Sequence, residues 1–230
     1  MNKRKAVILS GGLGTRLKPF TDIIPKPLLP VGGKAVLEIQ IDQLNKAGFT
    51  DVYLATNYKS DYIEKFFRDG TEYGVNLHIS REEKPLGTVG PLSLLRDELD
   101  STFLVMNGDI LTDMNFDRFY SFGIEKKSNL TVAIKEITLP FEFGNILFEN
   151  DRVTGIEEKP TIKKWALAGI YIMMPEILNR VPENERYNMD QLMKGMLSDG
   201  ESISKYEMSE YWLDIGRDED YERAQKVFKE

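Results

Sequence analysis

A glycine-rich loop with two basic side chains is the part of this sequence best suited to chemistry on phosphates. Residues 10–21 contain three glycines and Arg16, and residues 25–34 place Lys26 between two prolines. Glycines let backbone N–H groups approach a phosphate closely, and a planar, permanently charged guanidinium suits phosphate oxygens. These segments predict a site for a phosphate-bearing ligand. An ordinary strand-to-helix turn with solvated basic residues is the alternative.

The spacing of these residues excludes two common phosphate-binding motifs. A dinucleotide-binding fingerprint needs a third glycine where Leu17 stands after Gly12 and Gly14. A Walker loop needs Ser or Thr after its Gly-Lys pair, and the pair at 33–34 is followed by Ala35. The predicted phosphate site is therefore of another type.

Two aspartates are the candidate ligands for a divalent metal. Asp109 follows the apolar run 103–106 and is expected at the carboxyl end of a strand, and Asp214 lies in the segment 212–216. Mg²⁺ prefers one or two carboxylates, with substrate oxygens and water completing its octahedron, so two aspartates are enough. Each aspartate taken alone is equally typical of an ordinary turn.

The composition excludes several classes of protein. The 230 residues include no cysteine, which excludes disulfide scaffolds and cysteine-ligated metal sites, and the one histidine, His78, is interpreted as structural. The formal charge is −7, yet residues 1–34 carry seven basic side chains and one acidic. Such a chain is not expected to bind nucleic acid, while its basic segment suits a small anion. Lys3, Arg4 and Lys5 are expected to be solvated.

Short apolar, β-branched runs alternate with amphipathic segments of helical period in the first half of the chain. This alternation predicts an α/β fold, a Rossmann-like three-layer sandwich with a mixed, mainly parallel central sheet. Closely spaced strands in the second half predict its antiparallel part. The predicted strands are 6–9, 52–55, 75–79, 103–106, 130–135, 145–148, 152–156 and 169–173. The predicted helices are one with its apolar face at 36–44 that ends near Gly48, and those at 62–67, 91–99, 175–180, 189–197 and 218–228.

Nothing in the sequence predicts a targeting or membrane segment. The apolar run after Lys5 stops at Ser10, too early for a signal peptide. No uncharged stretch is longer than 165–175, which is well short of the roughly 18 residues that a membrane helix needs. Neither a linker-like composition nor an internal repeat occurs. We therefore expect one domain over residues 1–230, in the cytoplasm and without a membrane partner.

Several motifs, in this order, resemble those of the sugar-1-phosphate nucleotidyltransferases, the nucleoside-diphosphate-sugar pyrophosphorylases. The likeness extends over nearly the whole chain and points to catalytic domains of mannose-1-phosphate guanylyltransferases and related short enzymes that act on heptose or hexosamine phosphates. The C-terminal β-helix of hexapeptide repeats in some longer relatives is not expected here. The likeness is carried by residues 11–34, Pro85-Leu86-Gly87-Thr88-Val89-Gly90, Asn107-Gly108-Asp109, Glu157-Glu158-Lys159-Pro160, Ala168-Gly169-Ile170-Tyr171 and Trp212-Leu213-Asp214-Ile215-Gly216.

The resemblance implies a Mg²⁺-dependent nucleotidyl transfer. An oxygen of a sugar 1-phosphate, of mannose, manno-heptose or hexosamine type, would attack the α-phosphorus of a nucleoside triphosphate, with GTP favoured, and pyrophosphate would leave. This nucleophile is already an anion, so no Ser, Cys or His need be activated, in agreement with the composition. A homodimer is left open. Uridylyl, cytidylyl or thymidylyl transfer to another sugar 1-phosphate, such as that of N-acetylmuramate or glucose, is the alternative.

The resemblance also implies roles for individual residues. Arg16 would contact the β- and γ-phosphates and Lys26 the α-phosphate as catalytic groups, while Asp109 and Asp214 would hold the metal. Nucleotide contacts are implied for Leu9, Ser10, Gly11, Gly12, Gly14, Thr15, Gly87, Thr88, Asn107 and Gly108, and sugar-phosphate contacts for Gly144, Glu158, Lys159, Ala168 and Gly169.

The sequence departs from the family pattern at two positions. Ala35 replaces a proline before a helix, which we expect to alter helix entry, and Leu167 replaces an asparagine that usually touches the sugar. Two other interpretations stay open. One is a catalytically dead homologue that binds a nucleotide sugar and regulates a partner, although the retained basic and acidic residues argue against it. The other is a glycosyltransferase, for which an Asp-x-Asp motif is missing at 109–111.

Overall fold

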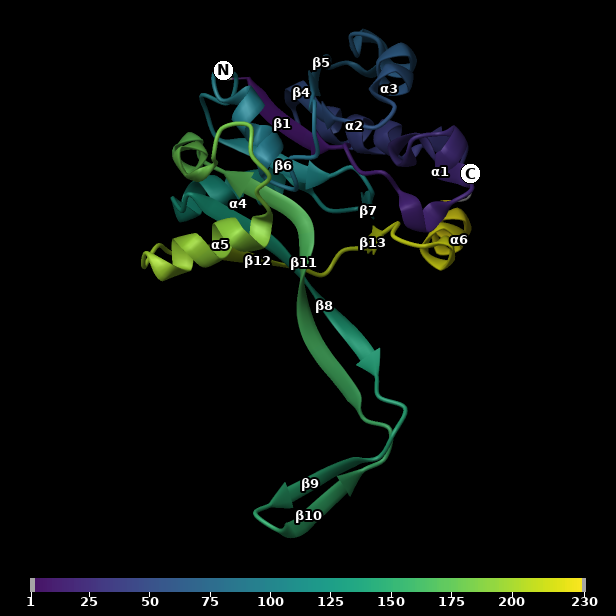
Figure 1. Cartoon of the computed structure of the whole chain (residues 1–230), viewed down its shortest axis with the longest axis vertical. Coiled ribbons are helices and arrows are strands. Elements are labelled where there is room, and N and C mark those ends of the chain that lie inside the picture. Colours follow the sequence, from purple (N-terminus) through teal and green to yellow (C-terminus); the bar gives the residue numbers. More distant parts are fainter. Residues whose placement is uncertain (1–2, 229–230) are drawn as a thin grey trace.

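The structure, a computed structural model, describes residues 3–228. A seven-stranded sheet forms its centre (Figure 1). Strands β6, β1, β4 and β5 are parallel to one another, β12 is parallel to β8, and β11 is antiparallel to both β6 and β8. This mixed, mainly parallel sheet confirms the predicted fold class. From edge to edge the strands are β12 (Ser204–Met208), β8 (Leu130–Pro140), β11 (Thr161–Met173), β6 (Phe103–Asn107), β1 (Arg4–Leu9), β4 (Phe49–Thr56) and β5 (Asn76–Arg81).

Helices cover both faces of this sheet. Successive side chains of β1 point to opposite faces: Ala6 and Ile8 pack with one set of helices, and Val7 packs with the other. Three layers result, as predicted. No helix within residues 3–228 is long and apolar enough to cross a membrane. One face carries α2 (Val36–Lys46), α3 (Ser60–Phe67) and α4 (Phe116–Lys126), and the other carries α5 (Met189–Ser198) with the 3₁₀ segments Gly90–Leu95 and Pro175–Arg180.

The C-terminal helix packs against the glycine-rich segment at the start of the chain. In α6 (Asp218–Val227), Tyr221 Oη donates a hydrogen bond to Pro30 O (2.7 Å). The Tyr221 ring also lies 5.9 Å from that of Phe20, the first residue of α1 (Phe20–Ile23). Pro30 belongs to a small ribbon of β2 (Pro30–Val31) and β3 (Lys34–Ala35). The two ends of the chain thus stabilise one another beside this segment.

Strands β8 and β11 continue beyond the sheet as a two-stranded arm, residues 135–166. Their pairing runs from Met173 opposite Leu130 in the sheet to Thr161 opposite Pro140 at the outer end. There β9 (Asn145–Glu149) and β10 (Arg152–Glu157) form a hairpin, which Figure 1 shows far from all the helices. The strands predicted at 130–135 and 169–173 are only the inner parts of β8 and β11. The outer parts pack against no core, so they carry no burial pattern.

The helix predictions differ from the structure in several places. Residues 175–180 form a 3₁₀ segment rather than an α-helix, and the short helix α1 was not predicted. Residues 91–99 form no α-helix, because Ser93 Oγ donates to Gly90 O (2.7 Å) and ties up the backbone of a short 3₁₀ turn. Helix α4 was not predicted, although Asn115 is a good N-cap whose side chain accepts a hydrogen bond from Arg118 N–H (2.9 Å).

The backbone at the entry into α2 is one that alanine or proline can adopt at position 35, and the expected change in helix entry stays a prediction. Ala35 has φ −65°, the value that a proline ring imposes. Its N–H lies 3.4 Å from Glu38 Oε2. Either residue fits this backbone, and the helix begins at Val36 in the ordinary way.

The basic residues at the amino end of β1 are paired rather than solvated. Arg4 Nη1 lies 2.5 Å from Asp117 Oδ1, and Lys5 Nζ lies 2.6 Å from Asp100 Oδ1. The Lys5 side chain is only 15% exposed. The expectation of solvation is wrong for these two residues. Lys3 stays exposed.

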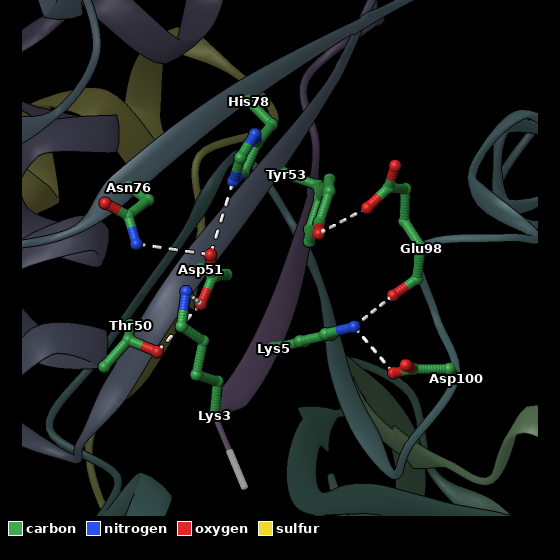
Figure 2. A network of polar contacts seen from close by, with 9 residues as sticks. All are labelled: Lys3, Lys5, Thr50, Asp51, Tyr53, Asn76, His78, Glu98 and Asp100. Atoms are coloured by element: carbon green, nitrogen blue, oxygen red, sulfur yellow. Dashed lines mark hydrogen bonds and ion pairs between the residues drawn. The ribbon is translucent and has the colours of Figure 1, made fainter.

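Asp51 is the centre of one of the two groups of polar contacts in Figure 2. Its buried carboxylate accepts hydrogen bonds from Thr50 Oγ1 (2.9 Å) and Asn76 Nδ2 (3.3 Å), and His78 Nε2 lies 3.4 Å away. Burial raises the pKa of Asp51, but these contacts and the charge of Lys3 outweigh it and hold the pKa below its usual 3.8. The fold therefore stabilises the ionised carboxylate.

We expect Asp51→Asn to destabilise the protein in a pH-dependent way. Because the pKa of Asp51 is lowered on folding, its contribution to the free energy of unfolding is present above about pH 3.8 and is lost as the pH falls through the folded pKa. Urea unfolding should show a loss of about 1–3 kcal/mol at pH 7 that shrinks below pH ~4. Asp100→Asn, at an exposed pair, should cost less than about 1 kcal/mol. If Asp51→Asn lowered the free energy of unfolding equally at pH 7 and below pH ~4, this account would be contradicted.

Candidate active site

The carboxyl ends of neighbouring parallel strands bring the candidate loops together. β1 and β6 pair in a register that places Leu9 opposite Asn107, so the loops that follow them leave the sheet side by side. Gly108 N–H donates to Leu9 O (2.9 Å), and Ser10 N–H donates to Ala55 O of β4 (2.7 Å). Open α/β sheets bind ligands at this edge.

Asp109 and Asp214 are brought together by a short two-stranded ribbon. β7 (Ile110–Thr112) pairs antiparallel with β13 (Trp212–Asp214), and Asp214 stands opposite Ile110. Ile215 N–H also donates to Asp109 O (3.0 Å). The two aspartates predicted as metal ligands are therefore neighbours, although they are far apart in the sequence.

These two carboxylates share a charged cluster with Lys26 and Arg16. Lys26 Nζ forms an ion pair with Asp109 Oδ2 in partly buried surroundings. Burial raises the pKa of Asp214, and the charge of Asp109 raises it further, while Lys26 and Arg16 act in the opposite direction. The net rise shows that the nearby cations do not fully compensate the Asp214 charge. A further cation would stabilise the ionised form.

The cluster fits a divalent metal. Oδ1 of Asp109 and Oδ1 of Asp214 are buried, and within the described structure neither has a hydrogen-bond partner. A buried carboxylate oxygen is costly unless a donor or a cation meets it. Residues 3–228 contain no group of three or more potential His, Cys, Asp or Glu ligands. What the chain offers is a pair of carboxylates with coordination positions left for substrate and water, which suits Mg²⁺.

A buried glutamine fixes the turn that carries Asp109. Gln40 of α2 is fully buried, and its Nε2 donates to Asn107 O (3.0 Å) and Ile110 O (2.8 Å). These bonds hold both sides of the turn. The sequence pattern gave one weak signal for this role, a polar residue on the otherwise apolar face of helix 36–44.

The glycine-rich loop and the Asp109 turn enclose a cavity of about 330 Å³, the loop pocket. Gly14 has φ +62°, a left-handed conformation that favours glycine. A Cβ on Gly12 would meet nothing within 4 Å, so this position opens on the pocket. The predicted site residues that line the loop pocket are Leu9, Ser10, Gly12, Gly14, Thr15, Arg16, Lys26, Gly108 and Asp109.

A second cavity of about 430 Å³, the strand pocket, lies across the same turn. Gly108 and Asp109 face the loop pocket, whereas Asn107 and Ile110 line the strand pocket. Gly169 has φ +72°, and a Cβ there would come within 2.6 Å of the Asn107 amide nitrogen. The predicted site residues that line the strand pocket are Thr88, Asn107, Ala168, Gly169 and Asp214, and Leu167 lines it too.

Glu82 is a candidate that the sequence motifs do not single out. It follows β5, its Oε2 accepts a hydrogen bond from Leu86 N–H (2.8 Å), and a Cβ on Gly11 would lie 2.6 Å from its Oε1. Burial raises the pKa of Glu82, and the bond from Leu86 partly offsets this. Gly87, with φ +83°, continues the same loop. The carboxylate therefore lies between the glycine-rich loop and the predicted base-recognition loop.

Three predicted sugar-phosphate residues lie outside both pockets. Gly144 directly precedes β9, and Glu158 and Lys159 follow β10, so all three are at the base of the distant hairpin in Figure 1. They stay close to one another, since a Cβ on Gly144 would lie 3.4 Å from Glu158 Oε2. Lys159 has φ +45°, which is uncommon for a residue with a side chain. Within one copy, the structure does not bring them to the carboxylates.

The sequence of the chain matches a known family. The family model described as Nucleotidyl transferase matches residues 5–230. The chain belongs to the nucleotidyl transferase family. This membership confirms the resemblance carried by the motifs, whereas the roles of the individual residues stay predictions.

Curated relatives of this nucleotidyl transferase include mannose-1-phosphate guanyltransferases. The chain is 33% identical over 226 residues to that of Neurospora crassa and 34% identical over 226 residues to that of Schizosaccharomyces pombe. Each match covers 94% of this chain and 62% of the relative. The chain thus spans less than two thirds of the length of these relatives.

Solved structures share the fold of this nucleotidyl transferase. HddC from Yersinia pseudotuberculosis has a TM-score of 0.77 at 28% identity, covering 98% of this chain and 100% of that one. Its complex with GMP-PN has a TM-score of 0.75 at 27% identity, with the same coverage. A Bacillus anthracis protein described as a glucose-1-phosphate thymidylyltransferase, in complex with a sucrose, has a TM-score of 0.82 at 24% identity, covers 99% of this chain and 96% of its own, and shows the fold alone.

We expect Gly12→Ala to weaken nucleotide binding without changing stability. The added methyl group meets no protein atom within 4 Å and projects into the loop pocket. Calorimetric titration with nucleoside triphosphates should show binding weaker by about tenfold or more, because overfilling a packed site costs about 1–3 kcal/mol. The free energy of unfolding should change by less than about 0.5 kcal/mol.

Gly14→Ala, in the same loop, is the comparison variant in which the added Cβ meets protein atoms. Its Cβ would lie 2.7 Å from Thr21 Cγ2 on a left-handed backbone. Urea unfolding should show a loss of about 1–3 kcal/mol. If Gly12→Ala binds triphosphates as tightly as the wild type, the loop pocket does not hold them.

Proposed function

We propose that this nucleotidyl transferase transfers a nucleoside monophosphate from a nucleoside triphosphate, GTP by preference, to a sugar 1-phosphate of mannose, manno-heptose or hexosamine type. The observation that carries the proposal is the meeting of Arg16, Lys26, Asp109 and Asp214 at one edge of the sheet, between two pockets. The similarity to mannose-1-phosphate guanyltransferases supports this choice of substrates.

The chemistry of this transfer requires positioned charge rather than a protein nucleophile. An oxygen of the sugar phosphate forms a bond to the α-phosphorus, the bond from the α-phosphorus to the oxygen that bridges it to the β-phosphate breaks, and pyrophosphate leaves with that electron pair. The attacking oxygen is already an anion, so no base must remove a proton. The protein must neutralise clustered phosphates and hold them in line. Neither cysteine nor histidine lines the two pockets of the described structure.

The residues of the cluster divide this work between them. Arg16 lines the loop pocket and would meet the β- and γ-phosphates as a planar fork. Lys26, next to Asp109 at the boundary of the pockets, would meet the α-phosphate, where charge develops. Asp109 and Asp214 would hold Mg²⁺. When bound, Mg²⁺ would neutralise phosphate oxygens and hold the triphosphate in place.

Glu82 favours guanine over the other bases. An ionised carboxylate only accepts hydrogen bonds. Guanine offers two adjacent donors, N1–H and the 2-amino group, whereas adenine and cytosine set an acceptor beside their amino donor, and uracil and thymine flank one N–H with two carbonyls. Glu82 lies beside Gly11, with one oxygen held by Leu86 N–H. Such a carboxylate matches guanine best.

A pyrophosphate-release screen tests the proposed function. The wild-type protein is assayed with four nucleoside triphosphates, with sugar 1-phosphates of mannose, manno-heptose, hexosamine, glucose and N-acetylmuramate type, and with Mg²⁺ or EDTA. We expect release that needs Mg²⁺ and is greatest with GTP and a mannose-type, heptose or hexosamine phosphate. Absence of release with every pair would reject the proposal in favour of a non-catalytic nucleotide-sugar-binding protein.

Lys26→Ala, assayed in the same screen, tests the catalytic role of Lys26. Removing a preorganised donor from the developing charge costs about 3–4 kcal/mol, so kcat should fall by ~10²–10³. Lys18→Ala, at an exposed lysine of the same loop that pairs with Asp22, should leave kcat close to that of the wild type. A Lys26→Ala variant with more than about a tenth of wild-type kcat would contradict the role of Lys26.

Glu82→Gln should weaken the preference for GTP. Replacing one acceptor oxygen with an NH₂ group removes a charge-assisted hydrogen bond and opposes guanine with a donor. We expect kcat/KM for GTP to fall by about 10- to 100-fold, with a smaller change for the other triphosphates. Glu83→Gln, at the exposed neighbour, is the matched control and should change nothing. Equal losses for all four bases would show that Glu82 does not read the base.

A further inference from the structure

The hairpin at the end of the arm presents one continuous apolar face to solvent. Phe148 pairs with Val153, and Ile146 pairs with Ile156, so these four side chains lie on the same side of the hairpin. Their exposed fractions run from 45% for Ile146 to 72% for Phe148. Nearly half of the exposed large apolar side chains within residues 3–228 lie on the arm.

An arm of this kind requires a surface to dock on. A two-stranded hairpin is marginally stable alone in water, and clustered exposed apolar groups mark interaction sites. The base of this hairpin also carries Gly144, Glu158 and Lys159, the residues that lie outside the pockets. Its docking surface should therefore be next to a site that these residues serve.

The part of the strand pocket that the structure describes lacks a basic side chain, and the arm carries one. Among the described residues that line it, the ionisable carboxylates are Asp190 and Asp214, and none is Lys or Arg. A sugar 1-phosphate entering it would bring a further negative charge, which needs a cation from the protein. Lys159 is exposed on the arm and can supply that charge.

The arm cannot reach the strand pocket of its own copy while its strands stay paired. Every residue from Thr161 to Leu167 of β11 has a partner on β8. Leu167 lines the strand pocket, and six residue steps in a strand place Thr161 about 20 Å away from it. Lys159 lies two residues further along the chain. Folding back would break this ladder, whereas docking on a neighbour leaves it intact.

We propose that the arm of each copy docks on the strand pocket of a second copy of this chain, so that Glu158 and Lys159 bind the sugar phosphate of the partner's site. This inference rests on the proposed function. A two-fold arrangement in which each copy gives its arm to the other is closed and self-complementary, so it makes a dimer with two complete sites. Glu158 would accept hydrogen bonds from sugar hydroxyls, and Lys159 would pair with the phosphate.

Cross-linking between mixed single-cysteine variants tests where the arm docks. The natural chain has no cysteine, so each introduced thiol is unique. One tagged variant carries Lys159→Cys and another Asp190→Cys, and a short bismaleimide is added to the mixture. We expect a cross-link that joins the two tagged chains. Lys46→Cys, on the exposed end of α2, replaces Asp190→Cys as the control and should give none.

The opposite result is equally clear. A chain that carries both Lys159→Cys and Asp190→Cys could instead cross-link within itself while the mixed single variants do not. The arm would then fold onto its own pocket, and the proposal would be overturned. Neither result depends on catalysis, so this test separates the docking of the arm from the proposed function.

Complementation between two defective variants tests the function of the docked arm. In a mixed dimer of Asp109→Asn and Lys159→Ala, one site would combine an intact Asp109 with an intact Lys159 from the other chain. We expect each single variant to be strongly impaired and the mixed dimer, purified through two tags, to regain about half of wild-type kcat. A mixed dimer as impaired as the single variants would reject transfer of Lys159 between copies. A wild type without activity would reject the proposed function and leave the cross-linking result unaffected.

Discussion

Two partly buried carboxylates, Asp109 and Asp214, brought together by the β7–β13 ribbon, set the requirements for the rest of the site. Placing Asp214 beside Asp109 in a partly buried position raises its pKa, so the pair costs free energy that the remaining fold must offset. Lys26 pairs with Asp109, and Gln40 of α2 holds the turn that carries Asp109. The site can hold concentrated charge because rigid, well-packed elements leave its groups no alternative position.

This dependence explains which features the sequence could predict. Asp109 was correctly placed at the carboxyl end of a strand, because a buried apolar run directly precedes it and such runs are local signals. The fact that Asp214 lies next to it depends on the pairing of β7 with β13, two three-residue strands with no local pattern of their own. Gln40 and Glu82 were missed because a single polar residue in an apolar segment indicates burial with a partner, but not which partner.

The arm was missed for a different physical reason. Hydrophobic periodicity reports which side of a strand faces a core, and residues 135–166 have no core within their own copy. Phe143 is 72% exposed, and Trp165 is 52% exposed. Motif resemblance nevertheless singled out Glu158 and Lys159, because it compares residues regardless of where the chain places them. The hydrophobic pattern therefore gave no signal for the arm, whereas the motif resemblance singled out two of its residues.

The two pockets differ in charge, and this difference explains what a docked arm would contribute. The loop pocket has its own cations, Arg16 and Lys26, whereas the lining of the strand pocket within the described structure contains carboxylates and no basic side chain. A triphosphate can thus bind to basic groups that are already in its pocket, whereas a sugar phosphate would need the cation that the docked arm supplies. Attack by water on the bound triphosphate competes with attack by the sugar phosphate, and closing a site excludes water. A strand pocket that gains its basic side chain only when Lys159 docks would couple that exclusion to the docking of the arm.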